Sequence, residues 1–179
     1  MNRTGLALLV IVLSSAGAAL AGAPVRSPLV GHWVLQVDKL TMMPPEARPK
    51  RVDLEFAEAA DGRWNSRVQI VDQADHELHS ESTLSLDGTP GMGSGTYWVD
   101  VVAATMPAPG VLVMQFAWQG QPASTRIYTV SVDGKTLTET EAFFRKDGTP
   151  AMRIAYFSRA SSYGRSFLTI PLSSGTNLK

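Results

Sequence analysis

The stretch RVDLEFAEAADGRWNSRVQI, residues 51–70, decides the fold of this chain. In each of its halves, 51–58 and 63–70, apolar and polar residues alternate, which is typical of a strand with one buried face. Asp61-Gly62 separates the halves, and Asp-Gly is among the strongest short-range hairpin signals because glycine accepts a positive φ. The stretch therefore predicts two antiparallel strands joined by a tight corner.

The same alternation continues along most of the chain. Further alternating segments cover residues 32–37, 77–86, 96–103, 111–118, 124–132, 135–144 and 151–157. Turn-forming residues separate these segments at 72–76, 87–88, 106–110, 119–122, 133–134 and 147–148. No long amphipathic helix pattern interrupts the series. The sequence therefore predicts an all-β protein of about eight to nine strands.

The short connections favour antiparallel neighbours, since parallel strands need long crossovers. A single sheet of this many strands protects its edges by closing into a barrel or by splitting into a sandwich. Sequential hairpins favour the barrel, because Greek-key sandwiches need at least one longer return connection. We therefore expect one domain, residues 24–160, that forms a single antiparallel up-and-down β-barrel.

The two ends of the chain have a different character. Residues 1–23 combine Arg3, an apolar run at 6–13 and an A-x-A pattern of small residues, which is typical of a cleaved secretory signal peptide. A transmembrane anchor is the alternative, but a spanning helix needs roughly 20 mostly apolar residues. The segment 161–179 ends in a polar run and is expected to be a partly disordered tail. We therefore expect an extracytoplasmic protein, periplasmic or secreted, with no membrane span after cleavage.

The composition excludes several classes of function. The 179 residues contain no cysteine, which removes thiol nucleophiles, thiolate metal sites and disulfides. The 16 acidic residues balance the 16 basic ones, so no basic excess favours binding to a nucleic-acid backbone. Nucleic acid is therefore not an expected partner.

Two segments resemble a known family. Gly31-His32-Trp33 opens the first predicted strand and looks like the G-x-W start of lipocalin-type barrels, in which the tryptophan packs across one end. The segment VSVDGKTLTETEAFFRKDGTPAMRIAYFSR, residues 130–159, resembles the C-terminal part of a group of small exported, lipocalin-like (calycin-type) bacterial proteins. The resemblance covers most of residues 30–159. It implies a ligand-binding barrel with no established enzymatic activity.

Catalytic and metal-binding patterns are weak. His76 and His79 lie near several carboxylates, but at this spacing in a strand they point to opposite faces. No G-x-S-x-G elbow is present, and the Gly-rich run 88–95 does not match a phosphate-binding loop. We therefore expect no metal, no cofactor and no enzymatic activity.

The candidate ligand-binding residues follow from the strand alternation and from one loop. Inward positions of the strands and two methionines of the Pro-rich loop 38–49 give the expected site. It consists of Trp33, Met42, Met43, Phe56, Trp64, Phe116, Arg126 and Tyr128. Adjacent methionines provide adaptable apolar surface for a ligand, for a partner or for the core itself.

Arg126 is the unusual member of this set. It shares a strand face with Tyr128, and an inward arginine needs a partner, which would suit an anionic or carboxylate ligand. Alternatively, Arg126 lies at the barrel mouth with its head group in water. Glu139 and Glu141 also share a face, and we interpret that face as solvated rather than as part of a polar cavity.

One motif occurs twice, as Asp87-Gly88-Thr89-Pro90 and as Asp147-Gly148-Thr149-Pro150. The residues around the two copies differ, so an internal duplication is poorly supported. Asp-Gly favours a tight corner, and proline suits a turn exit or a strand start. Both copies are therefore interpreted as hairpin corners.

Two functions agree best with these observations, ahead of a structural envelope protein and of an enzyme. The first is a barrel that binds a small hydrophobic or amphipathic ligand. The second is a protein-interaction module, such as an exported inhibitor or immunity protein, built on a solid barrel. A hollow apolar interior favours the first function. A filled barrel beside an exposed patch of Met42 and Met43 favours the second.

Overall fold

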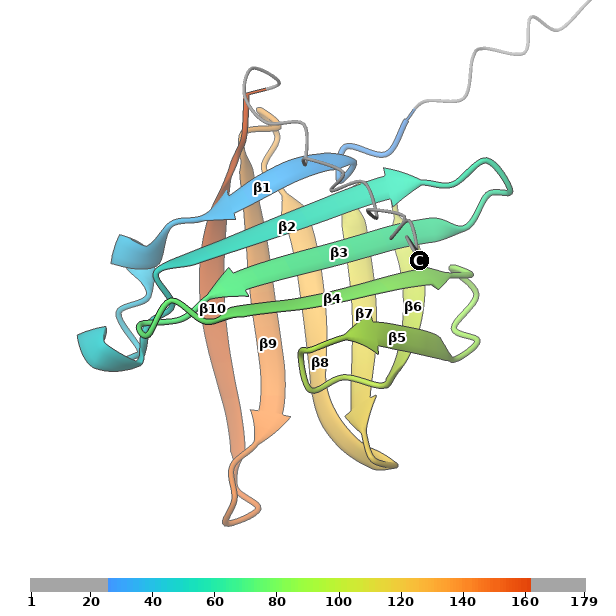
Figure 1. Cartoon of the computed structure of the whole chain (residues 1–179). Helices are drawn as coiled ribbons and strands as arrows, with labels where there is room; N and C mark the ends of the chain where they lie inside the picture. Colours follow the sequence, from blue (N-terminus) through green and yellow to red (C-terminus); the bar gives the residue numbers. More distant parts are fainter. Residues whose placement is uncertain (1–25, 162–179) are drawn as a thin grey trace, which may run out of the picture.

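A computed structural model describes residues 26–161 of the chain, and these residues form a closed antiparallel barrel of ten strands (Figure 1). The strands are β1 (Gly31–Leu35), β2 (Arg51–Glu58), β3 (Trp64–Val71), β4 (Glu77–Leu84), β5 (Gly91–Gly95), β6 (Val101–Ala108), β7 (Val111–Trp118), β8 (Gln121–Val130), β9 (Thr136–Phe144) and β10 (Pro150–Arg159). Two short 3₁₀ helices, η1 (Val37–Lys39) and η2 (Pro45–Ala47), lie between β1 and β2. The predicted signal peptide, residues 1–23, and all but the first residue of the predicted tail, 161–179, lie outside the described residues.

The strands follow one another around the barrel in chain order, which confirms the predicted all-β up-and-down architecture. β1 closes the ring by pairing with β10, with Trp33 opposite Arg159 and Leu35 opposite Phe157. In Figure 1, β1 to β5 cross steeply in front of β6 to β10, so the interior lies between two twisted halves of one sheet. Among residues 26–161, no helix is long and apolar enough to cross a membrane.

β5 is the strand that the sequence did not predict, and it explains why ten strands form instead of eight or nine. Its sequence, GMGSG, lacks the β-branched and aromatic residues that favour strands. It pairs with three residues of β4 and two of β6, so its neighbours rather than its own propensity hold it in the sheet. The predicted strand 96–103 begins only at Val101, because residues 96–100 form a loop between β5 and β6.

All four Asp-Gly pairs occur at hairpin corners, as predicted. Gly62, Gly88, Gly134 and Gly148 have φ values of 79°, 86°, 70° and 81°. In both copies of the repeated motif, an aspartate oxygen accepts a hydrogen bond from the amide of the threonine two residues later, at 2.8 Å for Asp87 and 3.0 Å for Asp147. The repeat is therefore turn chemistry that the fold uses twice.

One end of the barrel is closed by packed side chains. Trp33 is fully buried there, and its indole nitrogen donates a 2.9 Å hydrogen bond to the carbonyl of Leu29. The guanidinium of Arg159 covers the Trp33 ring and donates to the carbonyls of Pro28, Val30 and Gly134. This arrangement ties the start of the described chain to its last strand.

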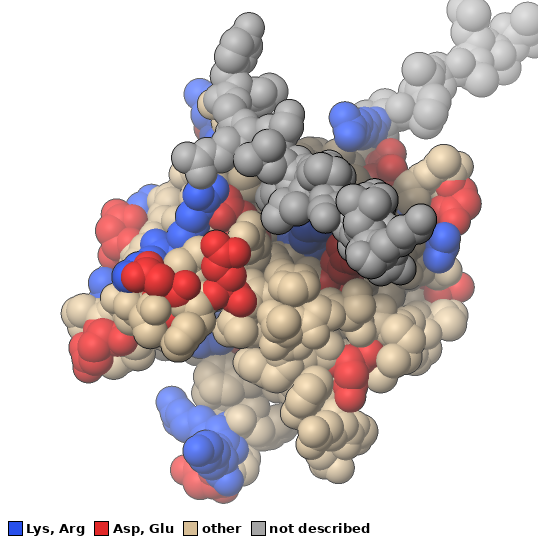
Figure 2. Space-filling view, viewed as in Figure 1, with Lys and Arg blue, Asp and Glu red and all other residues tan. Residues whose placement is uncertain are grey.

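Charged side chains lie on the outer face of β2, β3 and β4. Arg67 on β3 lies 3.1 Å from Glu81 on β4 and 3.9 Å from Glu55 on β2. Acidic and basic side chains are interspersed on the side of the molecule seen in Figure 2. Such mixed surface pairs contribute little stability each, and they mark this side as solvated.

Candidate functional site

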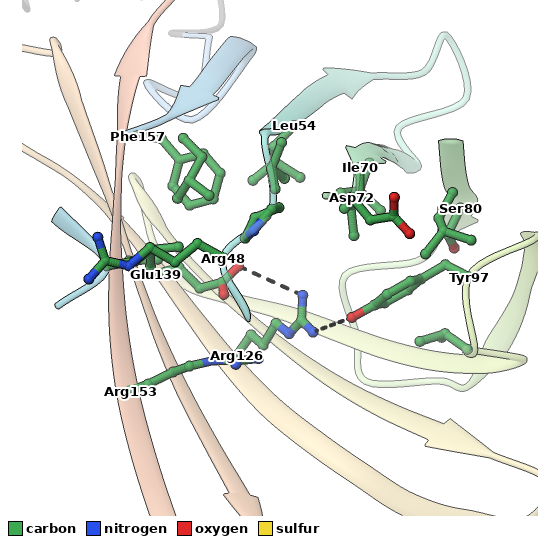
Figure 3. A pocket seen from close by; sticks show the side chains of 18 of the residues that line it. Arg48, Leu54, Ile70, Asp72, Ser80, Tyr97, Arg126, Glu139, Arg153 and Phe157 are labelled. Atoms are coloured by element: carbon green, nitrogen blue, oxygen red, sulfur yellow. Dashed lines mark hydrogen bonds and ion pairs between the residues drawn. The ribbon is translucent and has the colours of Figure 1, made fainter. Parts of the chain in front are cut away.

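The barrel encloses a cavity of about 480 Å³ (Figure 3). Its apolar wall is built by alternate residues of several strands and by the connections before β2 and β6. The aliphatic and aromatic lining residues are Leu35, Leu40, Val52, Leu54, Val68, Ile70, Leu78, Val99, Val102, Phe116, Ala155 and Phe157. Loop residues 46–49 and 72–74 line the cavity at the end of the barrel opposite Gly31. The interior is therefore hollow and largely apolar.

A cluster of four charged side chains lies on the β8–β9–β10 side of this interior. Arg126 Nη2 is 3.3 Å from Glu141 Oε1, and Arg126 Nη1 is 3.8 Å from Glu139 Oε2. Arg153 forms an ion pair with the second oxygen of Glu141. The side chains of Arg126 and Glu141 are only 12% and 3% exposed, so these charges are paired inside the protein. We call Arg126, Glu139, Glu141 and Arg153 the charge cluster.

Strand register explains why these four residues meet. Arg126 lies directly opposite Glu141 on β9, and Glu141 lies opposite Arg153 on β10. Glu139 is two residues from Glu141 on the same face and lies opposite Tyr128. Because directly opposite residues of an antiparallel pair project to the same side, one inward-facing arginine brings the other charged residues into the interior.

The surroundings of Arg126 and Tyr128 shift their proton affinities. Burial acts to lower the pKa of Arg126, but the nearby carboxylate of Glu139, together with Tyr128, Tyr97 and Glu141, raises it well above its usual value. Burial raises the pKa of the Tyr128 phenol well above 10, and the Glu139 carboxylate acts in the same direction. Arg126 is therefore held as a cation and Tyr128 as a neutral phenol.

The structure places Glu139 and Glu141 of β9 on the opposite face of the sheet from the one that we expected from the sequence. That interpretation placed these glutamates on a solvated outer face, and it was wrong because both are buried inside the barrel. The outer positions of β8, β9 and β10 carry uncharged side chains instead. They include Thr125, Ile127, Thr129, Thr136, Thr138, Thr140, Ala142, Phe144, Met152, Ile154, Tyr156 and Ser158.

Four of the eight predicted ligand-binding residues line the cavity, namely Met43, Phe116, Arg126 and Tyr128. Arg126 does not lie at the mouth with its head group in water, which was the alternative, because its partners bury it. The Phe116 ring lies 5.0 Å from the Arg126 guanidinium carbon, within the range of a cation–π contact.

The other four predicted residues do not line the cavity. Trp33, Phe56 and Trp64 are each at most 1% exposed and form the packed core. Phe56 contacts Trp64 and Tyr128, with ring centroids 5.6 Å and 5.2 Å apart. Met42 is 69% exposed, whereas Met43 turns inward and places its sulfur 3.7 Å from Arg153. The two adjacent methionines therefore have different roles.

Several polar residues that line the cavity were not predicted from the sequence. Tyr97 accepts a 3.4 Å hydrogen bond from Arg126 Nη2 (Figure 3). It belongs to the segment 96–103 that the sequence predicted as a strand, but it lies in the loop between β5 and β6. Ser66, Ser80 and Ser82 line the opposite wall. Their positions were detectable, since they share faces with Val68 and Leu84, but small hydroxyl residues give no distinctive signal.

Among residues 26–161, no group of three His, Cys, Asp or Glu side chains is arranged to hold a metal ion. His76 is instead paired with Asp72 of the same hairpin at 2.9 Å.

Comparisons with protein-family models, curated proteins and solved structures give no match for this chain. The function is therefore inferred from the geometry of the cavity.

Proposed function

We propose that the protein is an exported, non-enzymatic, lipocalin-like barrel that binds a small hydrophobic or amphipathic molecule in its interior. The cavity of about 480 Å³ is the observation that supports this function. Ligand sites typically measure roughly 300–1,000 Å³ and combine apolar walls with a few polar groups. The cavity fits both parts of that description.

The alternative function required a filled barrel and an exposed patch of both methionines. The interior is hollow, and Met43 lines it rather than standing beside Met42 on the surface. These observations favour a small ligand over a protein partner. The packed layer of Trp33, Phe56 and Trp64 closes one end, so a ligand enters past loop residues 46–49 and 72–74.

Titration of the purified chain with phenylnaphthylamine, a neutral dye that brightens in apolar surroundings, tests this function. We expect a saturable signal, and we expect solvent extracts of the freshly purified protein to contain a small lipophilic molecule by mass spectrometry. If neither is observed, the ligand-binding proposal is wrong.

A variant that fills the cavity locates the site. Ser80 lines the cavity, so Ser80→Phe is expected to weaken dye binding by roughly tenfold or more. Glu77→Phe is the matched control, because Glu77 lies exposed on the same strand. Far-UV circular dichroism confirms that both variants fold. Equal dye binding by both variants would place the dye outside the cavity.

A further inference from the structure

The charge cluster has equal numbers of cations and anions, and this balance limits what the β8–β9–β10 side of the cavity can accept. Three further charged residues, Glu46, Arg48 and Asp72, lie in the loops that line the cavity. Arg126 and Arg153 face Glu139 and Glu141, and each arginine has a carboxylate partner within ion-pair distance. An unpaired arginine in the interior would attract an anionic ligand. Here the protein already supplies the anions, so a ligand is not needed to neutralise Arg126.

A charged ligand head group would disturb this balance. A carboxylate placed near Arg126 would also approach Glu139, which lines the same cavity. An ammonium group placed near Glu139 would approach Arg126 and Arg153 for the same reason. Because like charges repel strongly away from water, either head group loses much of what it gains from its opposite partner.

Neutral hydrogen-bonding groups are available beside the cluster. The Tyr97 oxygen accepts a hydrogen bond from Arg126, and no acceptor among the described residues takes the Tyr97 hydroxyl proton. This O–H is therefore available to a ligand oxygen. Ser66, Ser80 and Ser82 place three hydroxyl groups on the facing strands, and each can donate or accept.

We infer that the cavity selects amphiphiles with a neutral, oxygen-bearing head group, such as an alcohol, ester or amide, over carboxylates and amines. In this arrangement the head group lies between Tyr97 and the serine hydroxyls, and the apolar body lies along the wall formed by Leu54, Val68 and Ile70. Figure 3 shows Tyr97, Ser80, Leu54 and Ile70 around this cavity. This inference rests on the proposed function and adds the chemical class of the ligand.

Three probes that share one alkyl chain test the inference. Dodecanol, lauric acid and dodecylamine compete with phenylnaphthylamine at neutral pH, where the acid is an anion and the amine a cation. We expect dodecanol to bind at least tenfold more tightly than either charged probe. If the dye binds but a charged probe matches or exceeds dodecanol, the inference fails while the proposed function stands. If neither the dye nor any probe binds, the proposed function fails and the inference with it.

Variants of the cluster shift the preference in predictable directions. Glu139→Gln keeps the shape of the side chain and leaves one excess cation, so lauric acid should gain about tenfold relative to dodecanol. Arg153→Gln leaves one excess anion and should favour dodecylamine by a similar factor. Glu55→Gln is the matched control, because Glu55 is 39% exposed and pairs with Arg67 on the outside of the barrel. Unchanged preferences in folded Glu139→Gln and Arg153→Gln proteins would contradict the inference.

Discussion

The guanidinium carbon of Arg159 lies 4.0 Å from the centroid of the Trp33 ring, which joins the last described strand to the first. The same guanidinium donates to three backbone carbonyls, at 2.7 Å to Gly134, 2.9 Å to Val30 and 2.6 Å to Pro28. Arg159 thereby covers the packed end of the barrel and holds three chain segments together.

Removing this side chain should therefore destabilise the barrel. Arg159→Met keeps an apolar stem over Trp33 but leaves the three carbonyls without their donor, which we expect to cost about 2 kcal/mol or more of unfolding free energy. Urea denaturation measures the loss. Arg145→Met is the control, since Arg145 lies exposed in the β9–β10 corner. Equal stability of the two variants would show that the Arg159 contacts contribute nothing.

Gly31 is coupled to the same arginine. Its φ is 142°, and a β-carbon there would lie 2.5 Å from Arg159 Nη1, so Gly31→Ala should displace the guanidinium from its hydrogen bond to Val30. We expect Gly31→Ala to cost at least ~1 kcal/mol more than Gly120→Ala, in which the φ of 75° is unfavourable but space is free.

A double-mutant cycle separates collision from backbone strain at Gly31. In the Arg159→Met background, the extra cost of Gly31→Ala should shrink because the obstructing guanidinium is gone. Strictly additive free energies of unfolding would exclude the coupling.

The hairpin corners should make the barrel sensitive to acid. A hydrogen bond from the Thr149 hydroxyl, and to a smaller extent one from the Thr149 amide, lowers the pKa of Asp147. The Thr89 amide and, to a smaller extent, the Thr89 hydroxyl lower the pKa of Asp87 in the same way. Because the folded pKa is lower, the unfolded chain binds more protons in acid. The stabilisation is present above the ordinary aspartate pKa of about 3.9 and is lost as the pH falls below it.

Substitution of these aspartates tests that sign. Asp87→Asn and Asp147→Asn together should reduce the drop in urea midpoint between neutral and strongly acidic solution. Asp38→Asn, a change in η1 rather than at a corner, is the comparison. An unchanged acid dependence in the double variant would contradict the prediction.

β5 should be the least protected strand of the barrel. Its pairing covers three residues of β4 and two of β6, whereas β3 and β4 pair over eight positions. We expect amide protection factors in β5 to be at least roughly tenfold lower than in β3, because fewer contacts must break to open it. Hydrogen exchange followed by NMR measures both. Equal protection would mean that the barrel opens only as a whole.

The strand order was predictable because it depends on local chemistry. Residues 51–70 carry both the alternation and the Asp-Gly corner, and similar corners recur around the barrel. β5 was not predictable, because glycine has no side chain whose packing would favour a strand. Its place in the sheet depends on pairing with β4 and β6 and not on the strand propensity of its own residues.

The candidate site was only half predictable for a similar reason. Alternation shows that Glu139 and Glu141 share a face, but it does not show which face is inside. Hydrophobicity usually decides this, and the inner face of β9 does contain the buried Leu137. Glu139 and Glu141 share that face because they are paired with Arg126 and Arg153. The partner that decides the orientation of β9 lies on another strand, which a single-sequence pattern does not reveal.

The pairing of β1 with β10 has a consequence for the connectivity of the chain. Because β1 pairs with β10, with Trp33 opposite Arg159, the ten strands form a closed ring. The order of the strands around this ring does not depend on which strand comes first in the sequence. Linking residue 26 to residue 161 and opening the chain at the exposed corner 145–148 should give a circular permutant with the same barrel. In such a protein the present first and last strands become neighbours in sequence, as they already are in space.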